Sequence, residues 1–282
     1  MTLGTRDSGL GTRDSGTTMR FADRVLGRTG VTVGPLGISA SYGVPTAAVE
    51  RAVEAGMTYV YWGSMRTAAF SEALRHLAPQ RDRFMLVVQS YSRVAPALTW
   101  SVERALRRIG YAHADVLLLG YWNRGMRVRI LEAARTLQRR GLVNFVGVSC
   151  HNRPVAVSLA AGGDYDVVHL RYSAAHPGAE RDVFPHLAAE NRPGIVAFTS
   201  TNWGRLLNPR YMPDGERTPT ASDCYRFVLS HPDVEVCATG PASADHVEQA
   251  IAARERGPMS GEELDWMRRV GAEVRRRAWL KQ

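Results

Sequence analysis

The segment TYVYWGSMRTAAFSEAL (residues 58–74) decides how the rest of the chain is interpreted. It begins with an apolar, β-prone run at Tyr59–Trp62, passes through a turn at Gly63–Ser64 and then becomes helical. A short apolar run followed by small and polar turn residues predicts a buried strand that leads into a helix. In parallel α/β proteins, side chains at the carboxyl ends of strands line the functional site. Tyr61, Trp62 and Arg66, at and just after this strand end, are therefore the first candidate site residues.

The same strand-then-helix pattern recurs along the chain. Eight short apolar segments alternate with helical segments, and they are almost continuously hydrophobic, as parallel strands covered on both faces are. The first predicted strand ends near Ile38, and the others span 59–62, 84–89, 115–120, 143–149, 166–172, 195–200 and 234–239. The predicted helices span 45–55, 69–77, 98–109, 128–140, 155–161, 181–190, 221–230, 245–256 and 261–280.

This alternation predicts an α/β fold of the (β/α)8 TIM-barrel type. Two β-prone arms around Gly27–Gly30 predict an N-terminal β-hairpin, and the amphipathic segment at 261–280 predicts an extra C-terminal helix. A doubly wound open sheet is the alternative. That fold usually carries a glycine fingerprint after its first strand, and GISASYG (residues 37–43) matches GxGxxG poorly.

Length and composition suit one large globular domain. The chain has 282 residues and 45% hydrophobic content, which predicts a single barrel domain over residues 20–282. Residues 1–19 contain LGTRDSG twice and lack apolar periodicity, so we expect a disordered extension there. No apolar run reaches the ~18 residues of a membrane span, and no signal-peptide core is present. We therefore expect a cytoplasmic protein with no membrane association.

The charged and sulfur-containing residues exclude several kinds of site. The net charge is +9, but the basic residues are scattered through predicted helices, which favours solvated faces over a nucleic-acid partner. Cys150, Cys224 and Cys237 form no CxxC pair, so neither a metal site nor a disulfide framework is indicated. Lys281 is the only lysine and stands beside the C-terminus. A mechanism that needs a buried lysine is excluded unless Lys281 folds back into the site.

Three segments carry a resemblance to a known family. LGRTGVTVGPLG (residues 26–37), FVGVSCHN (residues 145–152) and YRFVLSHPDVEVCATGPASADHVEQAI (residues 225–251) resemble the hairpin, strand-five and cofactor-loop regions of the aldo-keto reductase superfamily. The resemblance covers about residues 20–251, and its motifs are specific when taken together. It implies a barrel that binds NAD(P)H and reduces carbonyl groups.

The catalytic positions depart from the family pattern. Members use an Asp, Tyr, Lys and His tetrad, in which the tyrosine donates a proton. By position, the aspartate is replaced by Tyr61, the tyrosine by Arg66, the lysine by Gln89 and the histidine by Gly120. The resemblance therefore implies an oxidoreductase-type barrel with a non-standard or degenerate catalytic site.

Four groups at the predicted mouth remain as candidate catalytic residues: Tyr61, Arg66, Tyr121 and His151. Arg66 can stabilise an oxyanion but, because arginine stays protonated, it cannot act as a general acid. A tyrosine with a pKa near ~10 is a weak acid unless a neighbouring cation shifts it. His151 is the titratable imidazole near the mouth. The alternative is that the aromatic residues simply fill a mouth that has lost its catalytic groups.

The resemblance also implies residues that bind the cofactor, NADP or NAD. Ser149 matches the serine that contacts the nicotinamide amide, and Phe198 lies where an aromatic ring stacks on nicotinamide. TSTNWGRLL (residues 199–207) resembles the pyrophosphate loop, with Gly204 retained and Arg205 as a phosphate partner.

Other cofactor positions are altered. His169 occupies the usual glutamine position on strand six. After strand eight, Gly240, Pro241 and Ala242 stand where a lysine and serine type of 2′-phosphate site is usual. His246 and Glu248 fall near the positions that contact the adenine. The run as a whole favours a retained, weakened dinucleotide groove.

Two function classes stay open. The first is an NAD(P)-linked oxidoreductase that acts on a carbonyl or related group. The second is a barrel without reductase activity: a lyase- or isomerase-like enzyme, a ligand-binding protein or a regulatory pseudoenzyme. Aromatic residues predicted at the mouth favour an apolar or planar small-molecule ligand in either class. These residues are Trp62, Tyr91, Tyr121, Trp122 and Trp203.

Overall fold

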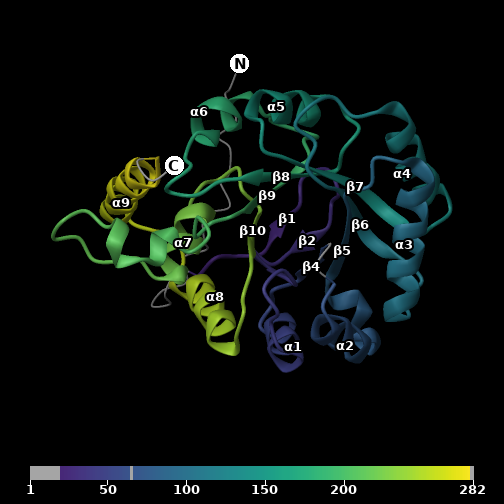
Figure 1. The fold of residues 1–282 in the computed structure, drawn as a ribbon, viewed down its shortest axis with the longest axis horizontal. Helices are drawn as coiled ribbons and strands as arrows, with labels where there is room; N and C mark the ends of the chain where they lie inside the picture. The colour runs from purple at the N-terminus through teal and green to yellow at the C-terminus, as the bar shows by residue number, and fades with distance from the viewer. Residues whose placement is uncertain (1–19, 64–65, 280–282) are drawn as a thin grey trace, which may run out of the picture.

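Eight parallel strands close into a barrel in the computed structural model, which describes residues 20–63 and 66–279 (Figure 1). Each strand pairs with the next along the chain, and the last pairs with the first. This closed order confirms the predicted (β/α)8 barrel and rules out the open sheet.

The predicted extension at 1–19, residues 64–65 of the turn, and residues 280–282 lie outside the described residues. The barrel strands are β3 (Leu36–Ser39), β4 (Tyr59–Trp62), β5 (Met85–Ser90), β6 (Ala114–Leu119), β7 (Val143–Cys150), β8 (Val167–Arg171), β9 (Gly194–Phe198) and β10 (Val236–Thr239).

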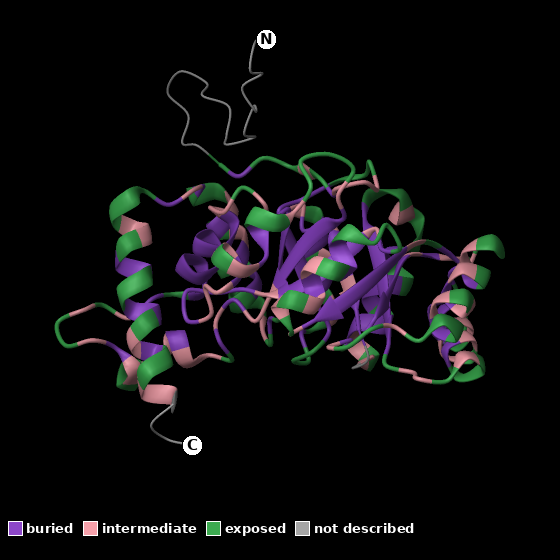
Figure 2. Cartoon of the chain, turned by 90° about the horizontal axis from the view of Figure 1, so that it is seen from above, coloured by how far each residue is buried: buried purple, intermediate pink, exposed green. Residues whose placement is uncertain are grey.

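The helices surround the barrel (Figure 1). Their inner faces are buried against the strands and their outer faces are exposed, so the buried residues gather at the centre of the molecule (Figure 2). Within residues 20–63 and 66–279, no helix is long and apolar enough to cross a membrane. The helices are α1 (Thr46–Glu54), α2 (Ala68–His76), α3 (Ala95–Ile109), α4 (Val128–Arg139), α5 (Arg153–Ala161), α6 (Ala179–Asp182), α7 (Ala221–Leu229), α8 (Ala244–Arg256) and α9 (Gly261–Trp279), with 3₁₀ turns η1 (Ala78–Arg83), η2 (Phe184–His186), η3 (Arg205–Leu207) and η4 (Pro209–Tyr211).

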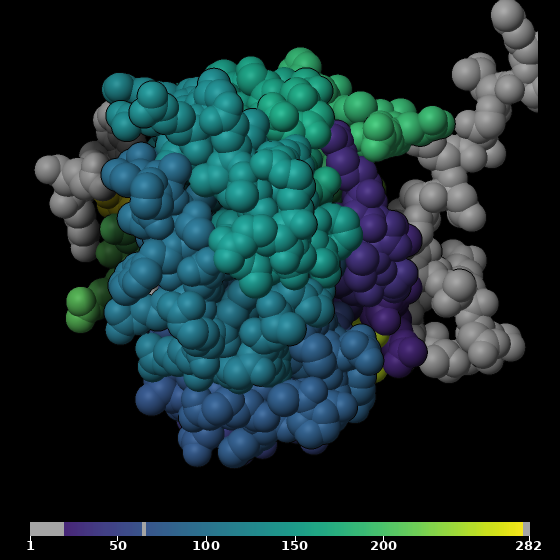
Figure 3. All heavy atoms as spheres, turned by 90° about the vertical axis from the view of Figure 1, so that its right-hand side faces the viewer, coloured from purple at the N-terminus to yellow at the C-terminus, as the bar shows by residue number. Residues whose placement is uncertain are grey.

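The predicted N-terminal hairpin is present and seals one end of the barrel. It consists of β1 (Arg24–Val25) and β2 (Thr32–Val33), paired antiparallel. Between them, Leu26 is fully buried among inward-facing barrel residues. Gly27 has a φ of 47°, and a Cβ there would lie 2.2 Å from the backbone nitrogen of Gly194, so only glycine allows this approach. Figure 3 shows this purple segment gathered at one side of the molecule, beside the helices of the barrel wall.

Side chains alternate across the barrel wall, and this alternation corrects two predictions. On β4, Tyr59 and Tyr61 belong to the inner cluster, whereas Trp62 is fully buried in the outer core between strands and helices. Trp122 is also buried in the outer core, with the guanidinium of Arg93 4.0 Å from its ring centroid. The prediction that Trp62 and Trp122 line the mouth is therefore wrong.

Proline positions explain the main differences in helix boundaries. The predicted helix at 181–190 is instead the short helix α6 followed by η2, because Pro185 lacks the N–H that would continue the helical hydrogen bonds. Conversely, α3 and α5 begin two or three residues earlier than predicted. Each has a proline in its first turn, where no N–H is needed.

A buried ion pair stabilises the sealed end of the barrel. Glu235 is only 6% exposed, and its carboxylate accepts hydrogen bonds from the guanidinium of Arg192 and the backbone N–H of Ile195, both at 2.6 Å. Burial raises the pKa of Glu235, and Arg192 opposes this rise. Arg24 of the hairpin donates hydrogen bonds to the backbone carbonyls of Val234 and Leu229. The Arg24 contacts join the hairpin to the end of α7 and to the segment that leads into β10.

Candidate functional site

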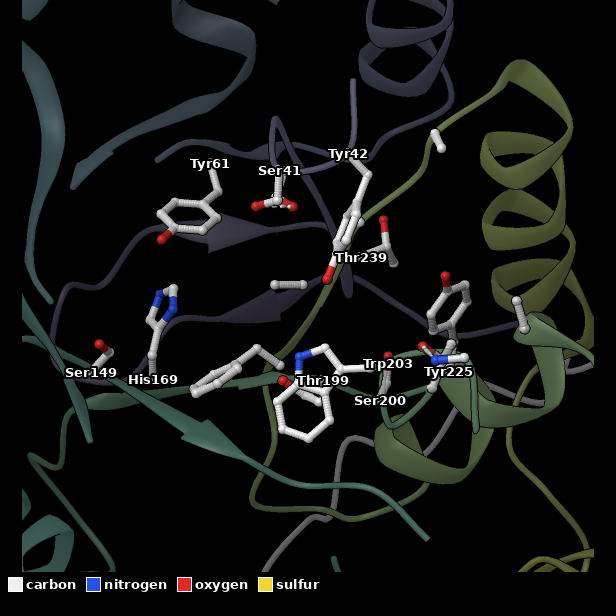
Figure 4. A pocket seen from close by; sticks show the side chains of 18 of the residues that line it. Ser41, Tyr42, Tyr61, Ser149, His169, Thr199, Ser200, Trp203, Tyr225 and Thr239 are labelled. Atoms are coloured by element: carbon white, nitrogen blue, oxygen red, sulfur yellow. Dashed lines mark hydrogen bonds between the residues drawn. The ribbon is translucent and has the colours of Figure 1, made fainter. Parts of the chain in front are cut away.

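A cavity of about 640 Å³ opens at the carboxyl ends of the barrel strands, and we call it the central cavity (Figure 4). Tyr61, Ser149 and His169 lie on one side of it and Tyr225 on the other, with the rings of Tyr42 and Trp203 between them (Figure 4). Nine of the eleven predicted site residues line this cavity. They are Tyr61, Tyr121, Ser149, His151, His169, Phe198, Gly204, Gly240 and His246.

Arg66 and Arg205 are the two exceptions. The guanidinium of Arg66 donates a 2.8 Å hydrogen bond to the backbone carbonyl of Gln89 and lies 5.2 Å from the ring centroid of Trp62. It lines a second depression, beside the end of β5, that shares Gln89 and Tyr91 with the central cavity. Arg205 begins the 3₁₀ turn η3 and does not line the central cavity. The structure therefore does not place Arg66 as an oxyanion partner there, because its charge is directed to backbone carbonyls of the barrel wall.

A histidine and a tyrosine form a buried pair in the barrel interior. The hydroxyl of Tyr59 lies 2.7 Å from Nε2 of His169. Burial lowers the pKa of His169 to about 3 and raises the pKa of Tyr59, which the neighbouring Tyr61 raises further. At neutral pH both groups are therefore uncharged, and His169 brings no positive charge to the cavity.

A second hydrogen bond joins Tyr61 and Gln89, the residues that the sequence resemblance places at the aspartate and lysine positions. Tyr61 donates its hydroxyl proton to Oε1 of Gln89 at 2.5 Å. Burial raises the pKa of Tyr61, the adjacent Tyr91 raises it further, and Arg66 opposes the rise. Since an efficient general acid has a pKa near the working pH, Tyr61 is poorly suited to give up a proton.

Gly120, which the sequence resemblance places at the histidine position, leaves room for other side chains. A Cβ added at this residue would lie 2.4 Å from carbons of the Tyr91 ring and 2.7 Å from Nε2 of Gln89. Both distances are too short for real contacts. The space that a histidine side chain would need is therefore taken by Tyr91 and Gln89.

Aromatic rings line one wall of the mouth. Tyr121, His151 and Phe198 meet edge to face, with ring centroids 4.9 Å and 5.2 Å apart along the series. Tyr121 has a φ of 59°, and its backbone N–H donates to the hydroxyl of Ser149 at 2.8 Å. Burial lowers the pKa of His151, and the nearby Arg171 lowers it further. The lowered pKa favours the neutral imidazole of His151, which can accept a proton at one ring nitrogen and donate a hydrogen bond from the other.

The segment from Thr199 to Leu207 presents backbone donors to the cavity. Thr199 and Trp203 have φ values of 61° and 54°, strained values for residues other than glycine. Within the described chain, the N–H groups of Ser200, Thr201 and Trp203 have no hydrogen-bond partner. Successive N–H groups in such a turn form a concave site for an anion.

The central cavity contrasts with the rest of this basic protein. Among the described residues that line it there is no Asp, Glu, Lys or Arg. Its polar groups are hydroxyls, amides and imidazoles. A bound ligand therefore meets hydrogen-bonding groups and aromatic rings, but no charged side chain.

Sequence reasoning missed several lining residues. Ser39 and Thr239 end the strands β3 and β10 and line the cavity, so the rule that located Tyr61 would have located both. Tyr42 lies in the loop after β3, and no local pattern in the sequence indicates its role. The resemblance marks Gln89 only as the loss of a lysine, whereas in the structure it is a buried hydrogen-bonding residue of the cavity.

Comparisons with known proteins agree with this architecture. No family profile matches the sequence, and no curated protein matches it. Among solved structures, the chain is similar to the holo form of an aldo-keto reductase from Bacillus halodurans, at 19% identity and a TM-score of 0.69 over 88% of this chain and 95% of that chain. It is also similar to an aldo/keto reductase from Klebsiella pneumoniae in complex with NADP and acetate, at 22% identity and a TM-score of 0.70 over the same shares of the two chains. The fold is that of the aldo-keto reductases.

Proposed function

We propose that this chain is a divergent aldo-keto reductase-like protein that binds NAD(H) or NADP(H) in the central cavity and has a degenerate catalytic site. The observation that carries the proposal is the arrangement of Phe198 beside the backbone donors at 199–203, on one wall of one cavity. The fold shared with proteins solved in complex with NADP or NADPH supports the same cofactor class.

The residues of this wall suit a dinucleotide. The ring of Phe198 offers a flat face for the nicotinamide, and Ser149 offers a hydroxyl for its amide. The unpaired N–H groups of Ser200, Thr201 and Trp203 suit the pyrophosphate, which needs donors rather than acceptors. A bound nicotinamide cofactor supplies the hydride in this class of chemistry.

The residues available for catalysis suit proton transfer less well than this wall suits cofactor binding. The proton of Tyr61 is held by Gln89 and its pKa is raised, whereas His151 and Tyr121 lie nearer the mouth. We therefore assign any remaining proton donation to His151 or Tyr121, and a binding role to Tyr61. Oxyanion stabilisation by a cation is missing from the described wall of the cavity, because Arg66 lies outside it.

The second candidate is a barrel without reductase activity that binds a small apolar or aromatic ligand for a binding or regulatory purpose. The uncharged lining favours it, because reduction of a carbonyl builds negative charge on oxygen, and no cationic side chain of the described lining meets that charge. Both candidates suit a cytoplasmic protein, where thiols such as the three buried cysteines stay reduced.

Titration of the protein with NADH and with NADPH, followed by calorimetry and by cofactor fluorescence, tests the proposal. We expect saturable binding, and we expect Phe198→Ala to weaken it by about 1–3 kcal/mol, the scale of one lost ring stack and its burial. Trp100→Ala is the matched control, because Trp100 is an exposed ring on α3 outside the central cavity. Absence of any heat or fluorescence change at millimolar concentrations of both dinucleotides would refute the proposal.

A further inference from the structure

We propose that the side-chain amide of Gln89 is the polar anchor for the substrate. In this proposal, Nε2 of Gln89 donates a hydrogen bond to the carbonyl oxygen of an uncharged, planar aromatic compound. The inference rests on the proposed function for the location of the substrate in the central cavity, and it adds the substrate class and the residue that recognises it.

The first step is the orientation of the amide. Gln89 is 3% exposed, so its side chain is held on all sides but one. Its Oε1 accepts the hydroxyl proton of Tyr61, so the oxygen end of the amide faces Tyr61. Nε2 then faces the opposite way, toward Gly120 and Tyr91. Tyr61 is therefore a positioning residue for this donor.

The second step is that the donor is available. Nε2 of Gln89 has no hydrogen-bond partner among residues 20–63 and 66–279, although Gln89 lines the central cavity. A nearly buried amide donor without a partner is costly unless a ligand or water satisfies it. Gly120 keeps the space beside this nitrogen clear of a side chain, since a Cβ there would approach it to 2.7 Å.

The third step is the shape of the surroundings. Four aromatic residues of the central cavity are more than half exposed, which is unusual for large apolar side chains in one place: Tyr42, Tyr91, Tyr121 and Trp203. Exposed rings grouped at a cavity mouth mark a surface for flat apolar ligands. Tyr91 links the two features, because its ring lies against Gly120 next to the Gln89 donor.

The fourth step is charge. A carboxylate or phosphate brought to Gln89 would lose its water in a cavity whose described lining holds no Lys or Arg to pair with it. A ketone or aldehyde oxygen needs only a neutral donor, which the amide supplies. The arrangement therefore selects an aromatic carbonyl compound over an aromatic acid of the same size.

Three naphthalenes that differ in one group test this selection without any cofactor. They are 2-acetylnaphthalene, with a neutral acceptor, 2-ethylnaphthalene, with none, and 2-naphthoate, with a charged one. By equilibrium dialysis, we expect 2-acetylnaphthalene to bind about 3- to 10-fold more tightly than 2-ethylnaphthalene, the range of one neutral hydrogen bond. We expect 2-naphthoate to bind more weakly than 2-acetylnaphthalene. Equal binding of the acetyl and ethyl compounds, stronger binding of the acid, or no binding of 2-acetylnaphthalene would overturn the proposal.

Variants locate the effect at Gln89. Gln89→Leu should remove the preference for the acetyl over the ethyl compound while 2-ethylnaphthalene still binds, which shows that the cavity is intact. Gln89→Met keeps a side chain of similar length but removes the donor, so it tests the same point if the leucine variant fails to fold. Tyr61→Phe should reduce the preference only in part, because the amide remains but its orientation is released. A preference that survives both Gln89 variants would assign the anchor elsewhere.

The outcome is independent of the dinucleotide titration. If NADH and NADPH fail to bind but 2-acetylnaphthalene shows the Gln89-dependent preference, the cofactor proposal fails and the anchor stands. If dinucleotide binds but the preference is absent, the anchor fails and the cofactor proposal stands.

Discussion

The hydroxyl of Tyr59 and Nε2 of His169 are 2.7 Å apart in the interior of the barrel, and both side chains are almost completely buried. Each is the other's polar partner in an otherwise apolar layer of Val, Leu and Met side chains. Protonation of His169 would place a charge where no acidic group faces it. The pair therefore ties the stability of the barrel to pH.

We expect the protein to lose stability in acid through His169. Its folded pKa is about 3, below the ordinary value of 6.5, so between these values the unfolded chain binds one more proton than the folded chain. The stabilising contribution is complete above pH 6.5 and is lost as the pH falls toward 3. In urea titrations at several pH values, His169→Gln should make this dependence shallower by up to about 1.4 kcal/mol per pH unit. His186→Gln, at an exposed position, is the control, and equal slopes for both variants would contradict the assignment.

We expect the reduction of ordinary aldehydes to be very slow or absent. The general acid and the charged oxyanion partner each supply about 10²–10⁴-fold in active enzymes, and neither has an effective counterpart in the described cavity. The measurement is NADPH and NADH consumption with a panel of aromatic aldehydes and quinones. Turnover at or above ~1 s⁻¹ would show that the catalytic site is not degenerate.

If turnover is found, two variants identify its proton donor. His151→Gln and Tyr121→Phe remove the ionisable groups at the mouth, and we expect one of them to abolish the remaining rate. Arg66→Gln is the matched control, because Arg66 lies outside the central cavity. Loss of the rate in Arg66→Gln alone would restore Arg66 as a catalytic group.

We expect Gly120 and Tyr91 to be energetically coupled. Gly120→Ala places a methyl group where the ring of Tyr91 now lies, so the ring must move. Urea denaturation of Gly120→Ala, Tyr91→Ala and the double variant forms a cycle, and we expect an interaction energy of about 0.5–2 kcal/mol. Gly120→Ala should lower the free energy of unfolding by less in the Tyr91→Ala background than in the unaltered protein. Additive effects would mean that the two residues do not contact each other.

We expect NADPH to bind no more tightly than NADH. The extra phosphate of NADPH carries negative charge, and no cationic side chain lines the described cavity. Ala242, at the position where the family resemblance places the 2′-phosphate site, is exposed and tolerant of a longer side chain. Ala242→Arg should therefore raise the affinity for NADPH about tenfold, as one charge-assisted contact does, and leave NADH unchanged. An equal gain for both dinucleotides would place the 2′-phosphate elsewhere.

We expect the buried carboxylate of Glu235 to matter far more than a surface ion pair. Glu235→Ala leaves the guanidinium of Arg192 and the N–H of Ile195 without their partner, which should cost about 3–5 kcal/mol of unfolding free energy. Glu248→Ala is the control, because Glu248 and Arg51 are both about half exposed and such pairs contribute about 0–1 kcal/mol. Similar melting temperatures for the two variants would contradict this account.

The fold was predictable from the sequence because hydrophobic periodicity acts over many residues. The alternation of apolar segments and helical faces places all eight barrel strands close to their observed bounds, with β4 reproduced at Tyr59–Trp62. Where a single residue decides, as Pro185 does, the periodic pattern predicted a helix that does not form.

The site was less predictable because a side chain's direction depends on strand phase. Tyr61 and Trp62 are neighbours in sequence, yet one lines the cavity and the other is buried in the outer core. The guanidinium of Arg66 is held by the carbonyl of Gln89, a contact between segments 23 residues apart that no local pattern reveals. Likewise, the amide of Gln89 can donate to a ligand only because Gly120, at the end of a different strand, carries no side chain beside Nε2.

The hairpin that buries Leu26 has a kinetic consequence. Because that end of the barrel is packed with side chains, a ligand approaches the Tyr61 and Gln89 pair from the mouth of the central cavity, which Trp203 and Tyr42 border. A dinucleotide held against Phe198 and residues 199–203 occupies this same approach. In the proposed function, association and release then follow a compulsory sequence, and the molecule bound deeper dissociates last. In this arrangement, the residence time of the molecule at Tyr61 and Gln89 depends on how fast the dinucleotide dissociates as well as on its own affinity.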